Sequence, residues 1–289
     1  FLHKDNDIRH NIFNLTLVTK TKKMKNTNEN VVWVTGASSG IGKAMAHQWA
    51  RLGYKVVLSA RRQDLLENVA EEIKQSNGEA LVIPCDILDE SSIENAVKQI
   101  INEWKRLDIV VANAGFGVFG SIENLSAKDW NRQFQGNVTG AALTVKYALP
   151  HLKKNNGRVG LVGSVGAYLP SPNLGAYGAS KAAIKNIGQT LQVELIGTGV
   201  SCTTLHPGFV VSEIARIDND GIWHPEREDP RPKNLIWPTD KAAKVMVKAI
   251  LKRKRNYVFT GHGKAVVFLQ RWFPGLMRTI ISKSPKPDA

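Results

Sequence analysis

Apolar runs that alternate with amphipathic segments constrain the fold of this chain more than any other feature. The apolar run from Val31 to Thr35 leads through a glycine-rich turn into Ile41, Met45 and Trp49, which recur at helical spacing until Gly53. The same rhythm continues to about Thr260 without an internal repeat. Strands that alternate with helices form a parallel sheet covered on both faces. The sequence therefore predicts a single doubly wound α/β domain.

The remaining elements are predicted from the same periodicity. The predicted strands are 55–59, 81–84, 108–112, 158–163, 200–205 and 257–260, and the predicted helices are 63–75, 91–104, 127–151, 177–196 and 239–253. The rhythm breaks over 209–238, which contains four prolines together with Trp223, His224 and Trp237. A long irregular stretch inside a compact domain is usually functional. We predict a lid here, with Trp223 and His224 as candidate substrate contacts.

The charge is concentrated at the two ends of the 289-residue chain. Residues 1–30 carry 6 basic and 3 acidic groups, 31–240 carry 21 of each, and 241–289 carry 12 basic and 1 acidic, giving the net +14. A nucleic-acid-binding domain would need a basic face on its body, so we predict no nucleic-acid partner. No run reaches the roughly 20 apolar residues of a membrane-spanning helix.

These patterns divide the chain into three parts. Residues 1–29 are polar and are interpreted as a disordered leader or cloning remnant, with a targeting peptide as the alternative. Residues 30–262 form the α/β domain, which includes the lid at 209–238. Residues 263–289 form a basic amphipathic segment.

The glycine-rich turn has the position of a dinucleotide-binding site. The sequence Thr-Gly-Ala-Ser-Ser-Gly-Ile-Gly at 35–42 lies between a strand and a helix. Glycines let the backbone approach a pyrophosphate, and the helix N-terminus supplies amide donors. The candidate cofactor contacts in this turn are Gly36, Ser38, Ser39, Gly40, Ile41 and Gly42.

Two arginines after the second strand indicate which dinucleotide is bound. An NAD-binding site places an acidic residue about 20 residues beyond the glycines, whereas this chain has Ala60 followed by Arg61 and Arg62. Guanidinium groups bind a phosphate through charge-assisted hydrogen bonds. We therefore predict NADP(H) as cofactor, with Arg61 favoured over Arg62. The alternative is that both arginines are only solvated.

Tyr177 and Lys181 form the candidate catalytic pair. Their i, i+4 spacing places them on one face of a helix. A tyrosine has a pKa of about 10, which a nearby ammonium lowers, so Tyr177 is a candidate general acid/base. Ser164 ends the preceding strand and can donate to a substrate oxygen. Asn137 lies in the preceding long helix. Taken singly, each of these residues has an ordinary structural interpretation.

Several motifs occur in a fixed order along the chain. They are TGASSGIG at 35–42, Asp86, Asn-Ala-Gly at 113–115, Asn137, Ser164, Tyr-Gly-Ala-Ser-Lys at 177–181 and His-Pro-Gly at 206–208. Together they resemble the short-chain dehydrogenase/reductases in their compact single-domain form. The resemblance covers about Val31 to Thr260. It implies a Rossmann-type sheet of seven parallel strands in the order 3-2-1-4-5-6-7 and hydride transfer at a nicotinamide ring.

The resemblance also implies roles for individual residues. Tyr177 would be the proton donor and acceptor, Lys181 would hold the nicotinamide ribose, Ser164 would orient the carbonyl, and Asn137 would hold a water of the proton relay. The implied cofactor contacts, besides Tyr177 and Lys181, are Asp86, Asn113, Ala114, Gly115, Pro207, Gly208, Val210 and Ser212. In the family a threonine often follows Pro-Gly, and the nearest hydroxyl here is that of Ser212. His206 is interpreted as a structural residue.

The implied strand order also separates the two cysteines. Cys85 and Cys202 would lie five strands apart, or about 24 Å at 4.8 Å per strand, whereas a disulfide needs Cα atoms within about 7 Å. We predict two free thiols, a reducing cytoplasmic location and no metal site. Family habit implies a homodimer or homotetramer.

The C-terminal segment repeats large apolar residues at helical spacing. They are Val266, Leu269, Phe273, Leu276 and Ile280, with Phe268 and Trp272 beside them. Pro274 should split this helix. Together with the basic run 252–255, the segment could lie on an anionic membrane surface. The alternative, which we favour, is packing over the substrate cleft or against another subunit.

The sequence thus predicts an NADP(H)-dependent oxidoreductase that interconverts an alcohol and a ketone or aldehyde. The tryptophans of the lid point to an apolar or lipid-like substrate. A non-catalytic NADP(H)-binding regulator, or a membrane-associated scaffold, is the alternative, but neither would require the complete set Asn137, Ser164, Tyr177 and Lys181.

Overall fold

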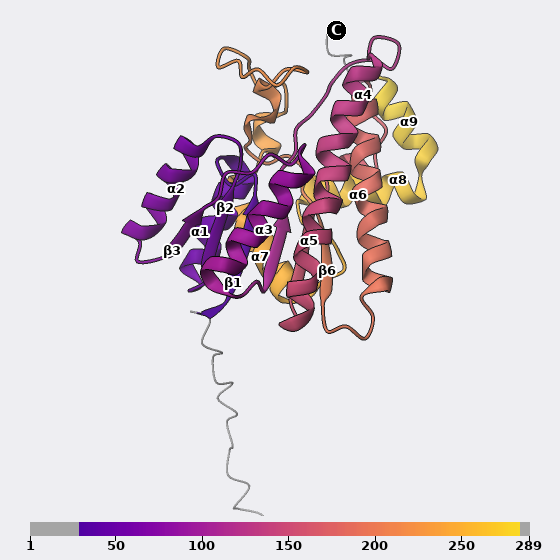
Figure 1. Cartoon of the computed structure of the whole chain (residues 1–289). Helices are drawn as coiled ribbons and strands as arrows, with labels where there is room; N and C mark the ends of the chain where they lie inside the picture. Colours follow the sequence, from indigo (N-terminus) through magenta and orange to yellow (C-terminus); the bar gives the residue numbers. More distant parts are fainter. Residues whose placement is uncertain (1–28, 284–289) are drawn as a thin grey trace, which may run out of the picture.

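A seven-stranded parallel sheet forms the centre of the computed structural model, which describes residues 29–283. Its strands are β1 (Val31–Thr35), β2 (Lys55–Ser59), β3 (Glu79–Val82), β4 (Ile109–Ala112), β5 (Arg158–Val162), β6 (Ser201–His206) and β7 (Asn256–Val258). They lie in the order β3-β2-β1-β4-β5-β6-β7 (Figure 1). The predicted doubly wound fold and strand order are confirmed.

The central strands are buried on both faces, as a parallel sheet requires. All five residues of β1 are buried. Val32 and Val34 face one apolar core, whereas Val31 and Trp33 face the other. This period of two explains why the strands appear in the sequence as continuous apolar runs.

Helices cover both faces of the sheet. The first core receives Trp49 from α1 (Gly40–Arg51), Leu66 from α2 (Gln63–Gln75) and Met246 from α7 (Thr239–Leu251). The second receives Ile100 from α3 (Glu90–Trp104), Leu152 from α5 (Ala141–Lys154) and Ile184 from α6 (Gly175–Glu194). In Figure 1 the second set lies in front of the strands. Because every strand pair in this sheet is parallel, the carboxyl ends of the strands lie along one edge, between the two helical layers.

The long helix predicted for 127–151 differs from the observed structure. It consists of α4 (Ala127–Phe134), a π-helical turn (Gln135–Gly140) and α5. A Cβ at Gly140 would lie 2.5 Å from the backbone oxygen of Ile87, so the turn packs directly against the chain that follows β3. Single π turns inside helices are frequent at functional sites, and a periodicity of 3.6 cannot reveal one.

The segment predicted to be a lid contains two short 3₁₀ helices, Glu213–Arg216 and Lys233–Leu235. Isolated bridges join Val210 to Trp237 and Ile217 to Trp223. The side chain of Asn219 exchanges two 2.9 Å hydrogen bonds with the backbone of Phe119. The segment, orange in Figure 1, is therefore tied to the loop after β4.

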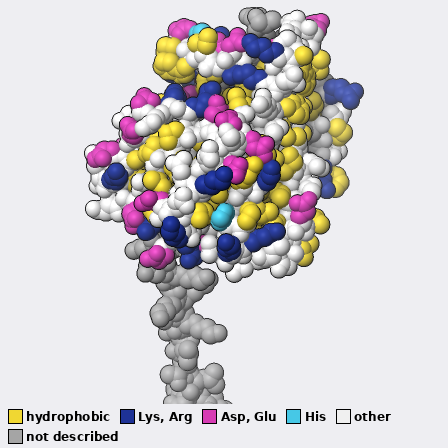
Figure 2. Space-filling model, viewed as in Figure 1, with side chains coloured by type: hydrophobic (Ala, Val, Ile, Leu, Met, Phe, Trp, Pro, Cys, Tyr) yellow, Lys and Arg dark blue, Asp and Glu magenta, His cyan; other side chains and the backbone are white. Residues whose placement is uncertain are grey.

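The chain ends in α8 (Gly261–Trp272) and α9 (Pro274–Ser282), which Figure 1 shows in yellow at the periphery. The break between them lies at Phe273 and Pro274, as predicted. Lys, Arg, Asp and Glu side chains alternate over the visible face of the body in Figure 2. The predicted leader and the last residues of the basic segment, 1–28 and 284–289, lie outside the described residues.

Candidate active site

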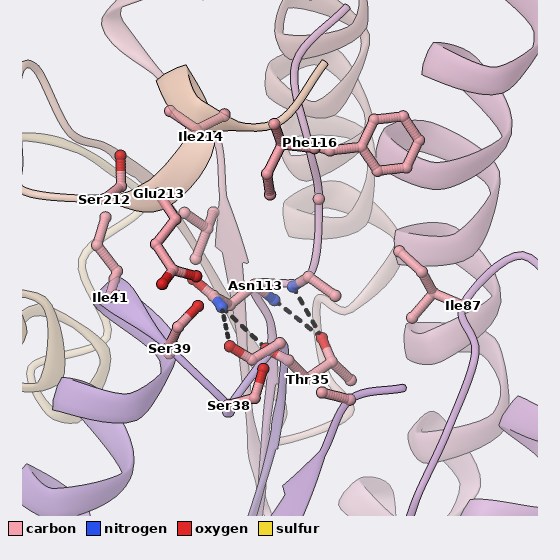
Figure 3. Close-up of a pocket in the computed structure, with 18 of the residues that line it drawn as sticks. Thr35, Ser38, Ser39, Ile41, Ile87, Asn113, Phe116, Ser212, Glu213 and Ile214 are labelled. Atoms are coloured by element: carbon pink, nitrogen blue, oxygen red, sulfur yellow. Dashed lines mark hydrogen bonds between the residues drawn. The ribbon is translucent and has the colours of Figure 1, made fainter. Parts of the chain in front are cut away.

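A cleft of about 380 Å³ opens at the carboxyl ends of the strands, beneath the lid (Figure 3). It is lined by all the predicted catalytic and cofactor-binding residues except Asn137. Ligands of doubly wound proteins bind at this edge of the sheet. The fold thus brings together residues that are distant in the sequence, and their roles remain predictions.

The glycine turn fits a dinucleotide pyrophosphate. Gly36 and Gly40 have φ angles of +66° and +53°, a backbone conformation that glycine adopts more readily than other residues. A Cβ at Gly36 would also lie 2.9 Å from the Cα of Ala114, so a side chain does not fit there. Helix α1 begins at Gly40 without an acidic residue in its first turn, and the side chain of Ser39 makes no capping hydrogen bond in the described structure. The first amides of α1 therefore remain free to bind an anion.

A buried threonine joins this turn to the end of β4. The hydroxyl of Thr35 accepts from the backbone nitrogens of Asn113 and Ala114, both at 3.1 Å. In return, Nδ2 of Asn113 donates to the backbone oxygens of Thr35 at 2.9 Å and Gly36 at 3.3 Å. Figure 3 shows these bonds below the cleft. They fix the glycine turn relative to the loop 113–115.

The two arginines after β2 have different environments. Nη2 of Arg62 lies 3.4 Å from Oε2 of Glu213 in the lid and 3.4 Å from Oγ of Ser38. Arg61 is exposed and has no ion pair in the part of the chain that the structure describes. Arg61 nevertheless acts on the cleft through its charge. Burial lowers the pKa of Arg132, another residue that lines the cleft, and the positive charge of Arg61 lowers it further. Arg61 is thus the available cation.

Helix α6 presents Tyr177 and Lys181 to the same cleft. Nζ of Lys181 lies 5.8 Å from the centre of the Tyr177 ring and donates to the backbone oxygen of Val162 at 3.1 Å. Lys181 is only 7% exposed. Burial lowers its pKa to about 8, because a low-dielectric environment disfavours the ammonium.

Ser164 and Tyr177 lie close together in the cleft, since a Cβ at Gly166 would lie 3.4 Å from both Oγ of Ser164 and Cε1 of Tyr177. Oγ of Ser164 accepts from the backbone nitrogen of Gly166 at 3.0 Å. Burial raises the pKa of Tyr177, while the Ser164 hydrogen bond and the charge of Arg231 lower it less strongly. The sequence argument expected Lys181 to lower this pKa. In the structure the lowering groups are Ser164 and Arg231, because Lys181 is directed to the carbonyl of Val162.

Asn137 lies behind the cleft wall, in the π turn. Its side chain accepts from the backbone nitrogen of Phe116 at 3.0 Å and donates to the oxygen of the same residue at 2.9 Å. A Cβ at Gly115 would lie 2.8 Å from Oδ1 of Asn137 and 3.7 Å from Nζ of Lys181. Gly115 therefore allows Asn137 and Lys181 to approach the same stretch of backbone.

Three further predicted residues hold the walls of the cleft. Asp86 accepts from the backbone nitrogen of Leu88 at 3.0 Å, and Ser212 accepts from Arg231 at 3.3 Å. His206 is fully buried at the end of β6, 3.3 Å from the backbone oxygen of Ser164, and burial lowers its pKa to about 4. This agrees with the structural role predicted for His206.

Sequence reasoning missed several residues that line the cleft. Arg132 stacks on the ring of Phe116 at 4.3 Å and donates to the backbone oxygen of Asn219. Glu213 and Arg231 enter from the lid, as does Trp223, which was a candidate. His224 does not line the cleft and instead lies between Asp218 and Glu226. Only the lid conformation, which periodicity does not encode, distinguishes these residues from solvated ones.

Comparison with known proteins places the chain in a family. The family model described as short chain dehydrogenase matches residues 30–222. The chain belongs to the short-chain dehydrogenase family. The family predicted from the motifs is therefore confirmed. A relative among these enzymes is the 11-beta-hydroxysteroid dehydrogenase of Pinus massoniana, 32% identical over 255 residues that cover 84% of this chain and 70% of the relative.

Two solved structures of short-chain dehydrogenase type are similar to this one. A short-chain dehydrogenase/reductase of Burkholderia phymatum in complex with NAD has a TM-score of 0.76 and 25% identity, covering 92% of this chain and 99% of that protein. An alcohol dehydrogenase of the archaeon Thermococcus sibiricus complexed with 5-hydroxy-NADP has a TM-score of 0.71 and 29% identity, covering 80% and 96%. This short-chain dehydrogenase thus shares its fold with proteins that bind either nucleotide.

Proposed function

We propose that the protein is an NADP(H)-dependent oxidoreductase that interconverts an alcohol and a ketone or aldehyde, with Tyr177 as general acid/base. The observation that carries the proposal is that two neighbouring hydroxyls, those of Tyr177 and Ser164, line the same cleft as the glycine turn. One end of the cleft suits a dinucleotide, and the other supplies a proton donor next to a second hydroxyl.

A nicotinamide cofactor supplies or accepts the hydride when it is bound. In the direction of reduction, the hydroxyl of Tyr177 donates its proton to the carbonyl oxygen of the substrate. Ser164, whose oxygen already accepts from the amide of Gly166, donates its hydroxyl proton in a hydrogen bond to the same substrate oxygen. Lys181, which is buried in the same cleft, would hold the nicotinamide ribose, and Asn137 holds the loop at Phe116 in place.

The free guanidinium of Arg61 supports NADP(H) over NAD(H). A 2′-phosphate carries charge that a guanidinium binds with two parallel hydrogen bonds. No acidic residue takes the ribose-binding position after β2, where Ala60 stands. We expect Arg61→Gln to weaken NADPH binding about tenfold or more and NADH binding little. Isothermal titration of both nucleotides tests this, and an equal loss for both would contradict it.

Turnover is tested with Tyr177→Phe. The variant keeps the ring but has no proton to donate, so activity on a panel of ketones and aldehydes should be abolished while NADPH affinity is retained. Full activity of the variant would refute the assigned role. A wild-type protein that binds NADPH but turns over no compound of the panel would favour the alternative of a non-catalytic regulator.

The lining of the cleft supports an apolar, lipid-like substrate. Phe116, Ile214, Ile217 and Trp223 face it, and the pine relative is a hydroxysteroid dehydrogenase by name. We propose that bulky apolar ketones are reduced faster than short polar ones. Competition between the two classes in one assay measures the preference, and equal rates would argue against it.

For the C-terminal helices we also propose attachment to an anionic membrane surface, in place of packing over the substrate cleft, because none of residues 261–282 lines the cleft. Contact with another subunit stays the alternative. No helix in residues 29–283 is long and apolar enough to cross a bilayer. The exposed large apolar side chains of α8, α9 and the residue between them are Phe268, Trp272, Phe273, Leu276 and Ile280. Residues 261–283 contain four lysines and arginines and no acid. Surface helices of this composition bind anionic lipid.

Sedimentation with phosphatidylserine vesicles tests the membrane proposal. The wild type should sediment, whereas the double variant Phe268→Ser, Trp272→Ser should remain in solution at low and high protein concentration. Absence of binding by the wild type would contradict the proposal and favour the alternative, an interface between copies of the chain.

We propose a homodimer or homotetramer in the cytoplasm, to be checked by light scattering and by fractionation of cells.

A further inference from the structure

One lid carboxylate is directed into the cofactor cleft. Glu213 begins the first 3₁₀ helix of the lid and lines the cleft. Figure 3 shows its side chain extending from the lid toward the turn that carries Ser38 and Ser39. Its Oε2 lies 3.4 Å from Nη2 of Arg62. The carboxylate thus neutralises one of the two arginines that suit a cofactor phosphate.

The position of Glu213 is held by the lid backbone. A Cβ at Gly40 would lie 3.9 Å from both Cα and Cβ of Ser212, so the lid rests on the glycine turn itself. Arg231 donates to the backbone oxygen of Val210 at 3.0 Å and to Oγ of Ser212 at 3.3 Å. These contacts on the preceding residues keep Glu213 above the turn.

A second cavity gives the Glu213 side chain an alternative place. It has a volume of about 390 Å³ and shares Gly40, Ser212 and Glu213 with the cofactor cleft. Its remaining wall includes Arg216 and Lys43, which is paired with Glu72, together with the carboxylates of Asp229 and Asp240. The cavity therefore gives the displaced Glu213 side chain room, but no unpaired cluster of positive charge. The ion pair to Arg62 is exposed on both sides, so breaking it costs little.

We propose that Glu213 is a specificity-determining residue that lowers the preference for NADP(H) over NAD(H). Its carboxylate competes with the cofactor's 2′-phosphate for Arg62, leaving Arg61 as the principal cation. A cofactor without the 2′-phosphate has no group that needs Arg62, so its binding depends less on Glu213. The inference rests on the proposed function, because it assumes that the cleft binds the dinucleotide.

The test compares two short ligands that differ in the 2′-phosphate. Titration calorimetry of 2′,5′-ADP and 5′-AMP is carried out with wild type and Glu213→Gln. We expect the variant to bind 2′,5′-ADP about three- to tenfold more tightly and 5′-AMP with little change. NADPH and NADH titrations should reproduce the difference. The control Glu228→Gln removes the same charge from an exposed lid position outside the cleft and should change neither affinity.

A double-variant cycle separates direct pairing from a general charge effect. In the Arg62→Gln background, Glu213→Gln should no longer tighten 2′,5′-ADP binding, since the competed arginine is gone. An equal gain for both ligands, an equal gain in Glu228→Gln, or a gain that persists without Arg62 would overturn the inference. A wild-type protein that binds neither NADPH nor NADH would instead refute the proposed function, so the two failures are distinct.

Discussion

The hydroxyl of Thr35 should stabilise both the fold and the cofactor site. The side chain is 2% exposed. Its oxygen accepts from Asn113 N and Ala114 N, each at 3.1 Å, and donates to Val111 O at 3.3 Å. Asn113 N also donates to Val111 O at 3.0 Å. Thr35→Val keeps the shape of the side chain but leaves the Ala114 amide without its hydrogen-bond partner.

Leaving a buried amide unsatisfied costs about 1–3 kcal/mol, and for the part-buried amide of Ala114 we take the lower end of that range, about 1 kcal/mol. We therefore expect Thr35→Val to lower the free energy of unfolding by that amount in urea denaturation, and to weaken NADPH binding because Ala114 lines the cleft. Thr35→Ser, which keeps the hydroxyl, should lose less.

Thr203 provides the matched control. It is equally buried, and its hydroxyl has no hydrogen-bond partner in the described structure. Thr203→Val removes an unsatisfied polar atom, so stability should be unchanged or slightly higher. If Thr35→Val and Thr203→Val shift the unfolding midpoint equally, the reasoning from hydrogen bonds is refuted.

Three further predictions concern a buried charge, the thiols and a glycine. Burial lowers the pKa of Lys181 to about 8, so the unfolded chain binds more protons than the native one between pH 8 and about 10.4. The free energy of unfolding should therefore rise with pH across that window by up to about 3 kcal/mol relative to Lys181→Met; parallel pH profiles would contradict this. Cys85 and Cys202 are free and buried, and burial raises both pKa values, that of Cys202 to about 12. An aromatic disulfide reagent should thus titrate two thiols in the unfolded protein and almost none in the native one, whereas fast native reaction would exclude this burial. A Cβ at Gly42 would lie 2.1 Å from Gly36 O, so Gly42→Ala should cost about 1–3 kcal/mol and weaken NADPH binding, whereas Gly275→Ala, with nothing within 4 Å, should do neither.

The sequence predicted the sheet well because its central strands are buried on both faces. Runs such as Val31–Thr35 have no other stable environment, and the helices between them have one clear apolar stripe. The boundaries of β3 and α6 lie about two residues from their predicted positions, because the ends of helices and strands fray and local sequence specifies them loosely. The π turn at 135–140 was missed because it inserts into a helix without interrupting its apolar pattern.

The candidate site was predictable where a residue type is tied to backbone geometry. The glycine turn joins β1 directly to α1, and the Tyr177–Lys181 pair lies on α6, so spacing fixed their positions. Glu213 and Arg231 lie in the irregular lid, where contacts with distant residues such as Arg62 decide the conformation. The same limit explains why Lys181 was expected to act on Tyr177 directly, although its amine donates to Val162.

The central claim is that a single cleft binds the cofactor and that Tyr177 transfers the proton there. Its most direct test is to measure NADPH binding and NADPH consumption side by side for wild type and Tyr177→Phe with a panel of apolar ketones. The account predicts equal binding by both proteins and consumption by the wild type alone. Consumption by both proteins, or binding by neither, would contradict it.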